Sequence, residues 1–233
     1  HCNQKCSHCY AAGQPMGTEE ELTTEQWKQI IDRCRAAGIP QVTFTGGEPT
    51  LREDFAELID YAQWFVTRLN TNGIMLTKEF CTKLAKASLD SVQITFYSEN
   101  EQIHNQLVGA QQFRNTLAGI ENALEAGLNV SVNTPLCLLN REYVRTLEFL
   151  HERGVRYVTC SGMITTGNAR RAESEYLQLN SEELQDILRE ACEYCYAHGM
   201  EISFTYHGWI ADEFFNELGI TRTTCGACLS NMA

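Results

Sequence analysis

The sequence predicts an α/β fold: a partial (β/α)6, TIM-like barrel of parallel strands covered by outer helices. Three observations predict it. Short β-patterned runs alternate with helical runs in units of about 30 residues, which is typical of parallel sheets. Glycine or proline stands at most junctions, and right-handed crossovers curl such units into a barrel. The 233 residues, 43% of them hydrophobic, suffice for one packed domain of this kind.

Each helix is predicted from apolar residues spaced three or four apart, as Trp27, Ile30, Ile31 and Cys34 are in the first. The predicted helices are 24–37, 55–62, 78–87, 115–126, 142–153, one that opens with Ser181 as N-cap, and a short amphipathic stretch at 209–218. The predicted strands are 41–45, 66–70, 91–97, 129–134, 157–161 and 201–205. Because the sequence starts at His1 and reaches Cys2 at once, we expect a segment of a longer chain, with another strand before Cys2.

Composition narrows the class of protein. The formal net charge of −12 disfavours a nucleic-acid partner. No apolar run approaches the ~18 residues of a membrane span. Eleven cysteines without a secretory signal favour a reducing, cytoplasmic setting, in which some thiols bind metal and the others are buried. Cys192 and Cys195 lie on the apolar stripe of their predicted helix, so we interpret them as buried thiols.

The unusual residues of the sequence fall where predicted strands end. In parallel barrels the active site lies at the carboxyl ends of the strands. These positions are the first cysteines, 46–48, 71–73, 97–98, 134–135 and 162–163. The sequence therefore predicts one functional rim.

Cys2, Cys6 and Cys9 form a C-x3-C-x2-C motif on that rim. Three thiolates on one short loop can bind three irons of a cubic [4Fe-4S] cluster and leave the fourth iron open for chemistry. The alternative is a zinc knuckle, which needs a fourth ligand, and His8 is poorly placed to supply it.

This motif is followed, one strand-helix unit later, by Gly46, Gly47, Glu48 and Pro49, and the pair of motifs resembles the radical S-adenosylmethionine (SAM) superfamily. The resemblance implies a [4Fe-4S] cluster whose open iron chelates the amino and carboxylate groups of SAM. It also implies that the Gly-Gly-Glu-Pro segment receives the methionine amino group. Glycines let a backbone approach a ligand closely.

The same resemblance implies further SAM contacts. His8 takes the position near the adenine, and Asn72 lies in the family's Thr-Asn-Gly segment. Thr95 and Asn133 take positions near the ribose. The sequence departs from the family where an arginine pairs with the SAM carboxylate, because Val108 stands there. Arg114 is the candidate substitute.

Cys225 and Cys228 resemble the opening of a SPASM extension, a region that binds auxiliary [4Fe-4S] clusters. This reading divides the chain into a barrel at 1–206 and, at 207–233, a linker helix with the start of a SPASM-like region. The alternative is a pair of surface thiols.

The resemblance implies an enzyme that reductively cleaves SAM to a 5′-deoxyadenosyl radical and abstracts hydrogen from a substrate. A SPASM-like tail points to a peptide or protein substrate, and a flavodoxin or ferredoxin type of protein is the expected electron donor. One alternative is a small-molecule substrate, a haem precursor or a nucleotide. Another is a non-catalytic iron-sulfur module. The sequence identifies no catalytic side chain beyond the cluster ligands.

Overall fold

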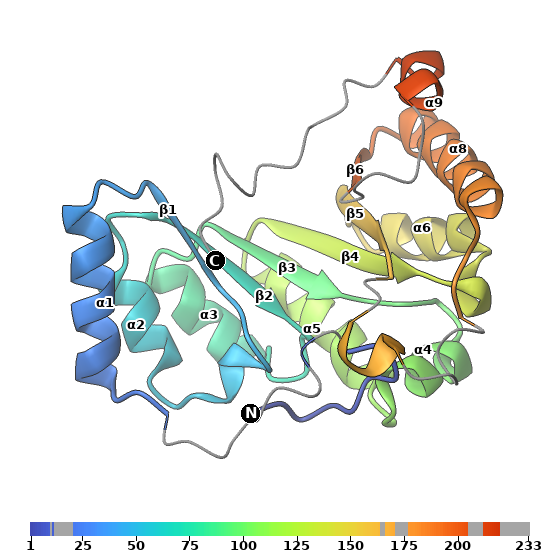
Figure 1. Ribbon diagram of the computed structural model, residues 1–233. Helices are drawn as coiled ribbons and strands as arrows, with labels where there is room; N and C mark the ends of the chain where they lie inside the picture. Colours follow the sequence, from blue (N-terminus) through green and yellow to red (C-terminus); the bar gives the residue numbers. More distant parts are fainter. Residues whose placement is uncertain (10, 12–20, 164–165, 171–176, 205–211, 220–233) are drawn as a thin grey trace.

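Six strands form one parallel sheet in the computed structural model of the protein, which describes residues 1–9, 11, 21–163, 166–170, 177–204 and 212–219 (Figure 1). The strands are β1 Gln41–Phe44, β2 Val66–Thr71, β3 Ser91–Thr95, β4 Val130–Leu136, β5 Tyr157–Gly162 and β6 Glu201–Phe204. They lie side by side in chain order, and every neighbouring pair is parallel. The predicted partial barrel is confirmed.

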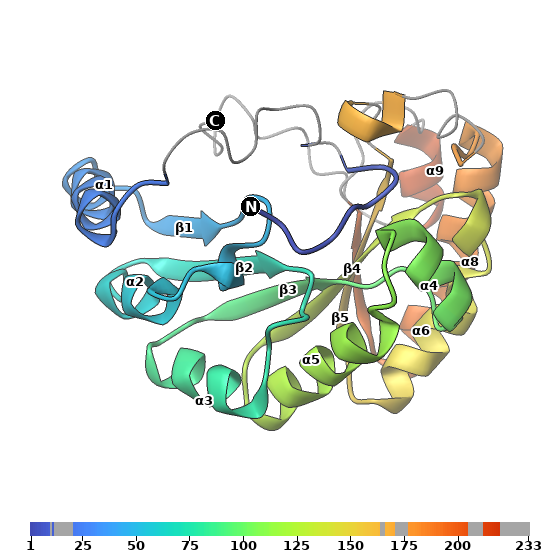
Figure 2. The same ribbon diagram turned by 90° about the horizontal axis from the view of Figure 1, so that it is seen from below.

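Helices connect the strands and cover the convex side of the curved sheet (Figure 2). The α-helices are α1 Thr24–Ala36, α2 Phe55–Tyr61, α3 Lys78–Lys86, α4 Glu101–Val108, α5 Phe113–Glu125, α6 Tyr143–Glu152, α8 Ser181–His198 and α9 Asp212–Glu217. Short 3-10 helices are η1 Pro49–Leu51, η2 Leu138–Asn140 and η3 Gly167–Arg170. Within the described chain, no helix has the length and apolar character needed to cross a membrane.

The two faces of the sheet differ because strand side chains alternate. On the convex face Leu69, Val92, Ile94 and Val132 are fully buried, and they pack with helix residues such as Ile120 in the main core. Side chains on the other face are only partly covered and mostly polar. The fold thus leaves a polar inner face open beside the carboxyl ends of the strands.

Helix α4 is absent from the predicted elements. Its apolar pattern is weak, yet its ends carry clear signals: the Asn100 side chain accepts hydrogen bonds from the Gln102 and Ile103 amides, and Gly109 ends the helix with a φ of 66°. At α8 the predicted N-cap, Ser181, is wrong. Asn180 takes that role because its backbone is extended and it forms a capping box with Glu183.

Five cysteines outside the motif are buried: Cys81, Cys137, Cys160, Cys192 and Cys195. Burial raises the pKa of the Cys192 thiol to about 11 and that of the Cys195 thiol to about 12. These groups therefore stay protonated and act as small apolar side chains, which confirms the interpretation of the second C-x2-C pair.

Candidate cofactor site

The three motif cysteines lie on the first nine residues, here called the cysteine loop, which run across the open side of the curved sheet (Figure 2). Backbone hydrogen bonds fix the loop to several segments, including the end of β1 and α4. The Glu48 amide donates to the His1 carbonyl at 2.8 Å, and the Ser7 amide donates to the Leu107 carbonyl at 3.1 Å. The loop is therefore held by the end of β1 and by the C-terminal turn of α4.

The thiols of Cys2, Cys6 and Cys9 are free and lie near one another. Burial raises the pKa of Cys6 to about 12, and the neighbouring Cys9 and Cys2 add to the rise. The pKa of Cys2 is also raised, first by burial and then by Glu48 and Cys9. In the described part of the chain, no three His, Cys, Asp or Glu side chains are close enough to share one metal ion.

This donor set fits an iron-sulfur cluster. Thiolates are the ligands such clusters use, and a bound metal deprotonates its thiols outright. Burial and the neighbouring thiols raise the pKa values of Cys2 and Cys6, and a cationic iron centre would stabilise their thiolates. Cys2, Cys6 and Cys9 are thus the residues that would hold the cluster.

His8 is held beside Tyr97, the second residue after β3. The His8 Nε2 and the Tyr97 hydroxyl are 2.9 Å apart, and the rings meet edge to face at 5.0 Å. Burial lowers the pKa of His8 to about 4, so its imidazole is neutral at physiological pH. Tyr97 also interacts with the Cys6 thiol, and burial raises the pKa of its hydroxyl. His8 is therefore fixed in place as part of the loop's support.

The two glycines after β1 have different uses. A Cβ on Gly47 would lie 2.0 Å from the His1 carbonyl oxygen, so only glycine lets the cysteine loop approach. A Cβ on Gly46 would meet no atom within 4 Å, and its φ is 150°. Gly46 thus leaves open space at the rim, whereas Gly47 makes room for the loop itself.

Glu48 is buried, and its carboxylate is used within the protein. One oxygen accepts hydrogen bonds from the Thr50 amide at 3.1 Å and the Thr71 hydroxyl at 2.7 Å. The other accepts from the Asn72 amide at 2.7 Å. Pro49 follows as the first residue of η1. Glu48 therefore ties the end of β1 to the end of β2.

Asn72 lies beside the cysteine loop. Its side-chain amide donates to Asn3 Oδ1 at 2.7 Å, while its own Oδ1 accepts from the Ile74 amide at 3.0 Å. The structure thus brings the Thr-Asn-Gly segment, the Gly-Gly-Glu turn and the cysteine motif together, as their positions at strand ends predict.

Thr95 and Asn133 are register partners on β3 and β4, and both side chains lie on the inner face. The Thr159 hydroxyl donates to Asn133 Oδ1 at 2.8 Å, and Gln93 Nε2 donates to the Thr159 hydroxyl at 3.2 Å. These neutral groups form a polar network at the carboxyl half of the sheet.

Arg114, the candidate substitute for the missing family arginine, is the second residue of α5. Its side chain is 85% exposed and pairs with Glu101 at 3.4 Å. Val108 is buried, and its carbonyl accepts from the Lys5 amide at 3.3 Å. This position therefore supports the cysteine loop through its backbone. Cys225 and Cys228 lie outside the described residues.

Asn168 of η3 is a site residue that sequence reasoning missed. Its side-chain amide donates to the Cys6 carbonyl at 3.1 Å, and its backbone amide donates to the Cys9 carbonyl at 3.0 Å. No short motif marks this contact, because it joins segments about 160 residues apart in the sequence.

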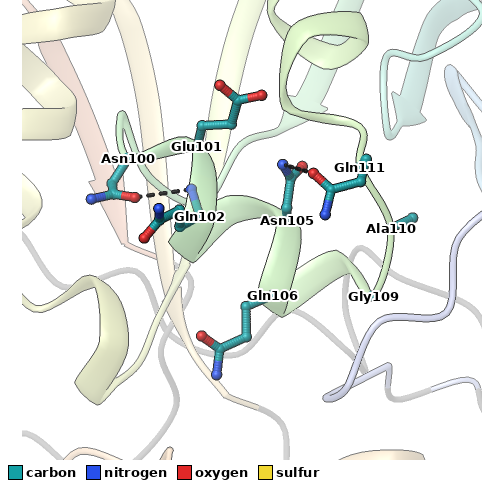
Figure 3. A pocket seen from close by; sticks show the side chains of 8 residues that line it. All are labelled: Asn100, Glu101, Gln102, Asn105, Gln106, Gly109, Ala110 and Gln111. Atoms are coloured by element: carbon teal, nitrogen blue, oxygen red, sulfur yellow. Dashed lines mark hydrogen bonds between the residues drawn. The ribbon is translucent and has the colours of Figure 1, made fainter.

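A hollow of about 1000 Å³ lies along α4 and its turn into α5 (Figure 3). It is lined by Asn100, Glu101, Gln102, Asn105, Gln106, Gly109, Ala110 and Gln111. None of the predicted cofactor residues is among them. The amide of Asn105 binds Gln111, and that of Asn100 caps α4, so two of the lining amides serve the local backbone and its turn (Figure 3).

Comparison with known families agrees with this geometry. The profile of the Radical SAM superfamily matches residues 1–150, and these residues include the cysteine loop, the Gly-Gly-Glu turn and the first four strands. The chain belongs to the radical SAM superfamily. Radical SAM proteins use a [4Fe-4S] cluster and SAM, and the thiols described above supply the matching donors.

Individual radical SAM proteins are similar to this chain over about half their own length. Fe-coproporphyrin III synthase of Methanosarcina barkeri is 31% identical over 81% of this chain and 48% of its own. A probable GTP 3′,8-cyclase of Thermococcus kodakarensis is 35% identical over 57% of this chain and 43% of its own. SuiB of Streptococcus suis, solved with S-adenosylmethionine, has the same fold, with a TM-score of 0.72, 16% identity, and coverage of 92% of this chain and 49% of its own.

Proposed function

We propose that this protein cleaves SAM reductively and uses the resulting radical to abstract a hydrogen atom from a substrate. The observation that carries the proposal is the cysteine loop: three adjacent free thiols, braced at the carboxyl ends of the strands beside the Gly-Gly-Glu turn. When held by Cys2, Cys6 and Cys9, a reduced cluster would supply the one electron for cleavage of SAM to methionine and, after transfer of a substrate hydrogen, 5′-deoxyadenosine.

The residues of this chain would bind and orient the cofactor. Cys2, Cys6 and Cys9 would hold the cluster, and the open space at Gly46 is suited to the methionine end of SAM. The rest of the proposed contacts come from His8, Gly47, Glu48, Pro49, Asn72, Thr95 and Asn133. Since the carboxylate of Glu48 is fully used by the two strand ends, we assign it the role of shaping the turn.

The first candidate substrate is a peptide or protein, which the SPASM-like reading of Cys225 and Cys228 favours. The fold is also shared with SuiB, which has been solved bound to its precursor peptide SuiA. The remaining proposals are auxiliary [4Fe-4S] clusters in the C-terminal region and an electron donor of the flavodoxin or ferredoxin type.

A small-molecule substrate is the second candidate. It is favoured by sequence similarity to Fe-coproporphyrin III synthase and to a probable GTP 3′,8-cyclase. The name of the first refers to a tetrapyrrole, and the name of the second refers to a nucleotide. Both candidates share the same radical-forming step, so the first experiment addresses that step.

The test is formation of 5′-deoxyadenosine by the full-length protein, reconstituted without oxygen, reduced with dithionite and supplied with SAM. We expect the Cys6→Ala variant to lose about 100-fold or more of this activity, beyond the 10- to 100-fold that loss of a supporting partner costs at a metal site. Cys34→Ala is the matched control, because Cys34 lies half-buried on α1 away from the loop. Unchanged cleavage by Cys6→Ala would contradict the proposal.

A further inference from the structure

The inner face of the sheet is polar and almost uncharged. Its side chains are those that alternate with the helix-packed residues, and most of them are Ser, Thr, Asn or Gln. Two of these residues carry a charge, Arg68 on β2 and Glu201 on β6. In a chain with 30 acidic and 18 basic side chains, a face with so few charges stands out from the rest of the surface.

Arg68 has no charge partner in the part of the chain that the structure describes. Its side chain is exposed, and within the described residues its guanidinium has no hydrogen bond or ion pair. The neighbours in register are neutral, Thr43 on β1 and Ser91 on β3. Glu201, the other charge on this face, lies four strands away in the sheet order.

Other arginines lie elsewhere in the fold. Arg52, Arg114, Arg145, Arg153 and Arg189 each form an ion pair with a carboxylate, and all five lie outside the strands. Arg33 and Arg141 form no ion pair within the described residues, but they also lie outside the strands. Arg68 alone among these eight stands on a strand of the barrel and points to its inner side, where the backbone is held rigidly on both edges.

The position of Arg68 relates it to the candidate cofactor site. It lies two residues before Asn70 on the same face, and β2 ends at the Thr-Asn-Gly segment that contacts the cysteine loop. Strands β3, β4 and β5 contribute the neutral chain of Gln93, Asn133 and Thr159. The inner face therefore offers one guanidinium and many neutral hydrogen-bonding groups below the rim.

A guanidinium presents its donors in a planar fork that matches a carboxylate or a phosphate. We propose that Arg68 binds an anionic group of the substrate, a carboxylate or a phosphate, on the inner face of the barrel. This inference rests on the proposed function, since it places the substrate beside the site of radical formation. It also gives the substrate a chemical class: a molecule that carries at least one carboxylate or phosphate.

The test is equilibrium binding to the full-length, cluster-loaded protein without oxygen. Three probes separate the possible sources of the anion: coproporphyrin III for propionate carboxylates, GTP for a phosphate, and hexaglutamate for an acidic peptide. Guanosine and the tetramethyl ester of coproporphyrin III are the neutral counterparts. We expect at least one anionic probe to bind more tightly than its neutral counterpart, or, for hexaglutamate, more tightly than hexaglutamine.

The variant Arg68→Gln should weaken that binding by about 10- to 100-fold, the range for loss of hydrogen bonds to a charged group. Arg68→Lys should restore part of it, because the charge returns without the planar fork. Arg33→Gln, which removes the same charge from an exposed position on α1, should bind like the wild type. Because binding is measured without turnover, failure to cleave SAM would count against the proposed function alone. Equal binding by Arg68→Gln, or no binding of any probe to the wild type, overturns this inference.

Discussion

Buried polar side chains near the rim are nearly all used to hold backbone segments together. The carboxylate of Glu48 joins two strand ends, and the amide of Asn140 binds the carbonyls of Tyr97 and Pro135. Each bond satisfies a group that would otherwise be costly to bury. His104 differs, because within the described residues its Nε2 is buried with no partner, while its Nδ1 lies 3.4 Å from the Tyr97 amide.

The unfolding free energy should fall in acid because of His104. Burial among the rings of Phe96 and Phe113 lowers the pKa of His104 to about 4 from a reference value of 6.5. An unfolded chain therefore takes up a proton below pH 6.5 that the folded chain refuses until about pH 4. The contribution of His104 to stability is complete above pH 6.5 and is lost as the pH falls from there to about 4.

We expect a loss of about 2 kcal/mol from this residue between pH 7.5 and pH 5, from 1.36 kcal/mol per pKa unit. His104→Phe keeps an aromatic ring but cannot titrate, so urea unfolding of the metal-free protein should show a smaller drop over this range than the wild type. The control is His198→Gln at an exposed position of α8. Parallel pH profiles for the wild type and His104→Phe would contradict the prediction.

At the scale of elements, helix α5 and the turn after β2 approach each other more closely than side chains allow. Gly119 of α5 faces Gly73, whose φ is 79°, and a Cβ on Gly119 would lie 2.1 Å from the Gly73 carbonyl oxygen. Thr116, one turn earlier, donates its hydroxyl to the Asn72 carbonyl at 3.0 Å. Helix α5 thus positions the Thr-Asn-Gly segment from behind.

Gly119→Ala should be destabilising, and the sign of the change is informative. In an exposed helix, glycine to alanine stabilises by about 1 kcal/mol. Here the new methyl group meets backbone rather than a flexible side chain, so helix and turn must move apart. We expect the melting temperature to fall by several degrees, which a shift of about 1–3 kcal/mol produces in a domain of this size. A rise in melting temperature would show that the two segments separate without cost.

At the scale of the whole molecule, the sequence predicts the parts that depend on local patterns. Alternating β and helical runs reveal all six strands, and the cysteine spacing reveals the loop. Helix α4 is not predicted because its residues are mostly polar and its apolar stripe is short. Its capping residues, Asn100 and Gly109, are nevertheless typical of helix ends. The sequence does not predict the contacts of Asn168 or the close approach of Gly119 to Gly73, because both depend on how distant segments meet in the fold.

The cysteine loop ties together segments that are far apart in the chain. Its partners are the end of β1, the Thr-Asn-Gly segment, the C-terminal turn of α4 and η3. Cys6 also packs against the small apolar cluster of Tyr97, Leu107, Val108 and Cys137, but the four partners hold the loop through hydrogen bonds that water can replace. A cluster bound to Cys2, Cys6 and Cys9 would fix the loop and, through it, all four partners.

Removal of the cluster should therefore loosen a defined set of amides. We expect hydrogen exchange to become faster in the metal-free protein at Ser7, Glu48 and Asn168, whose amides bond across the loop contacts. The amide of Phe96, which donates to Asn133 at 3.0 Å within the sheet, should keep its protection. Asn168→Ala should speed exchange at Ser7 even in the loaded protein, because it removes the bond to the Cys6 carbonyl. Asn122→Ala, which removes a bond to the Leu76 carbonyl behind the sheet, is the matched control. If the exchange rate rises evenly over the whole chain, the cluster stabilises the fold globally. If the exchange rates at Ser7 and Asn168 do not change, the loop is already rigid without the cluster.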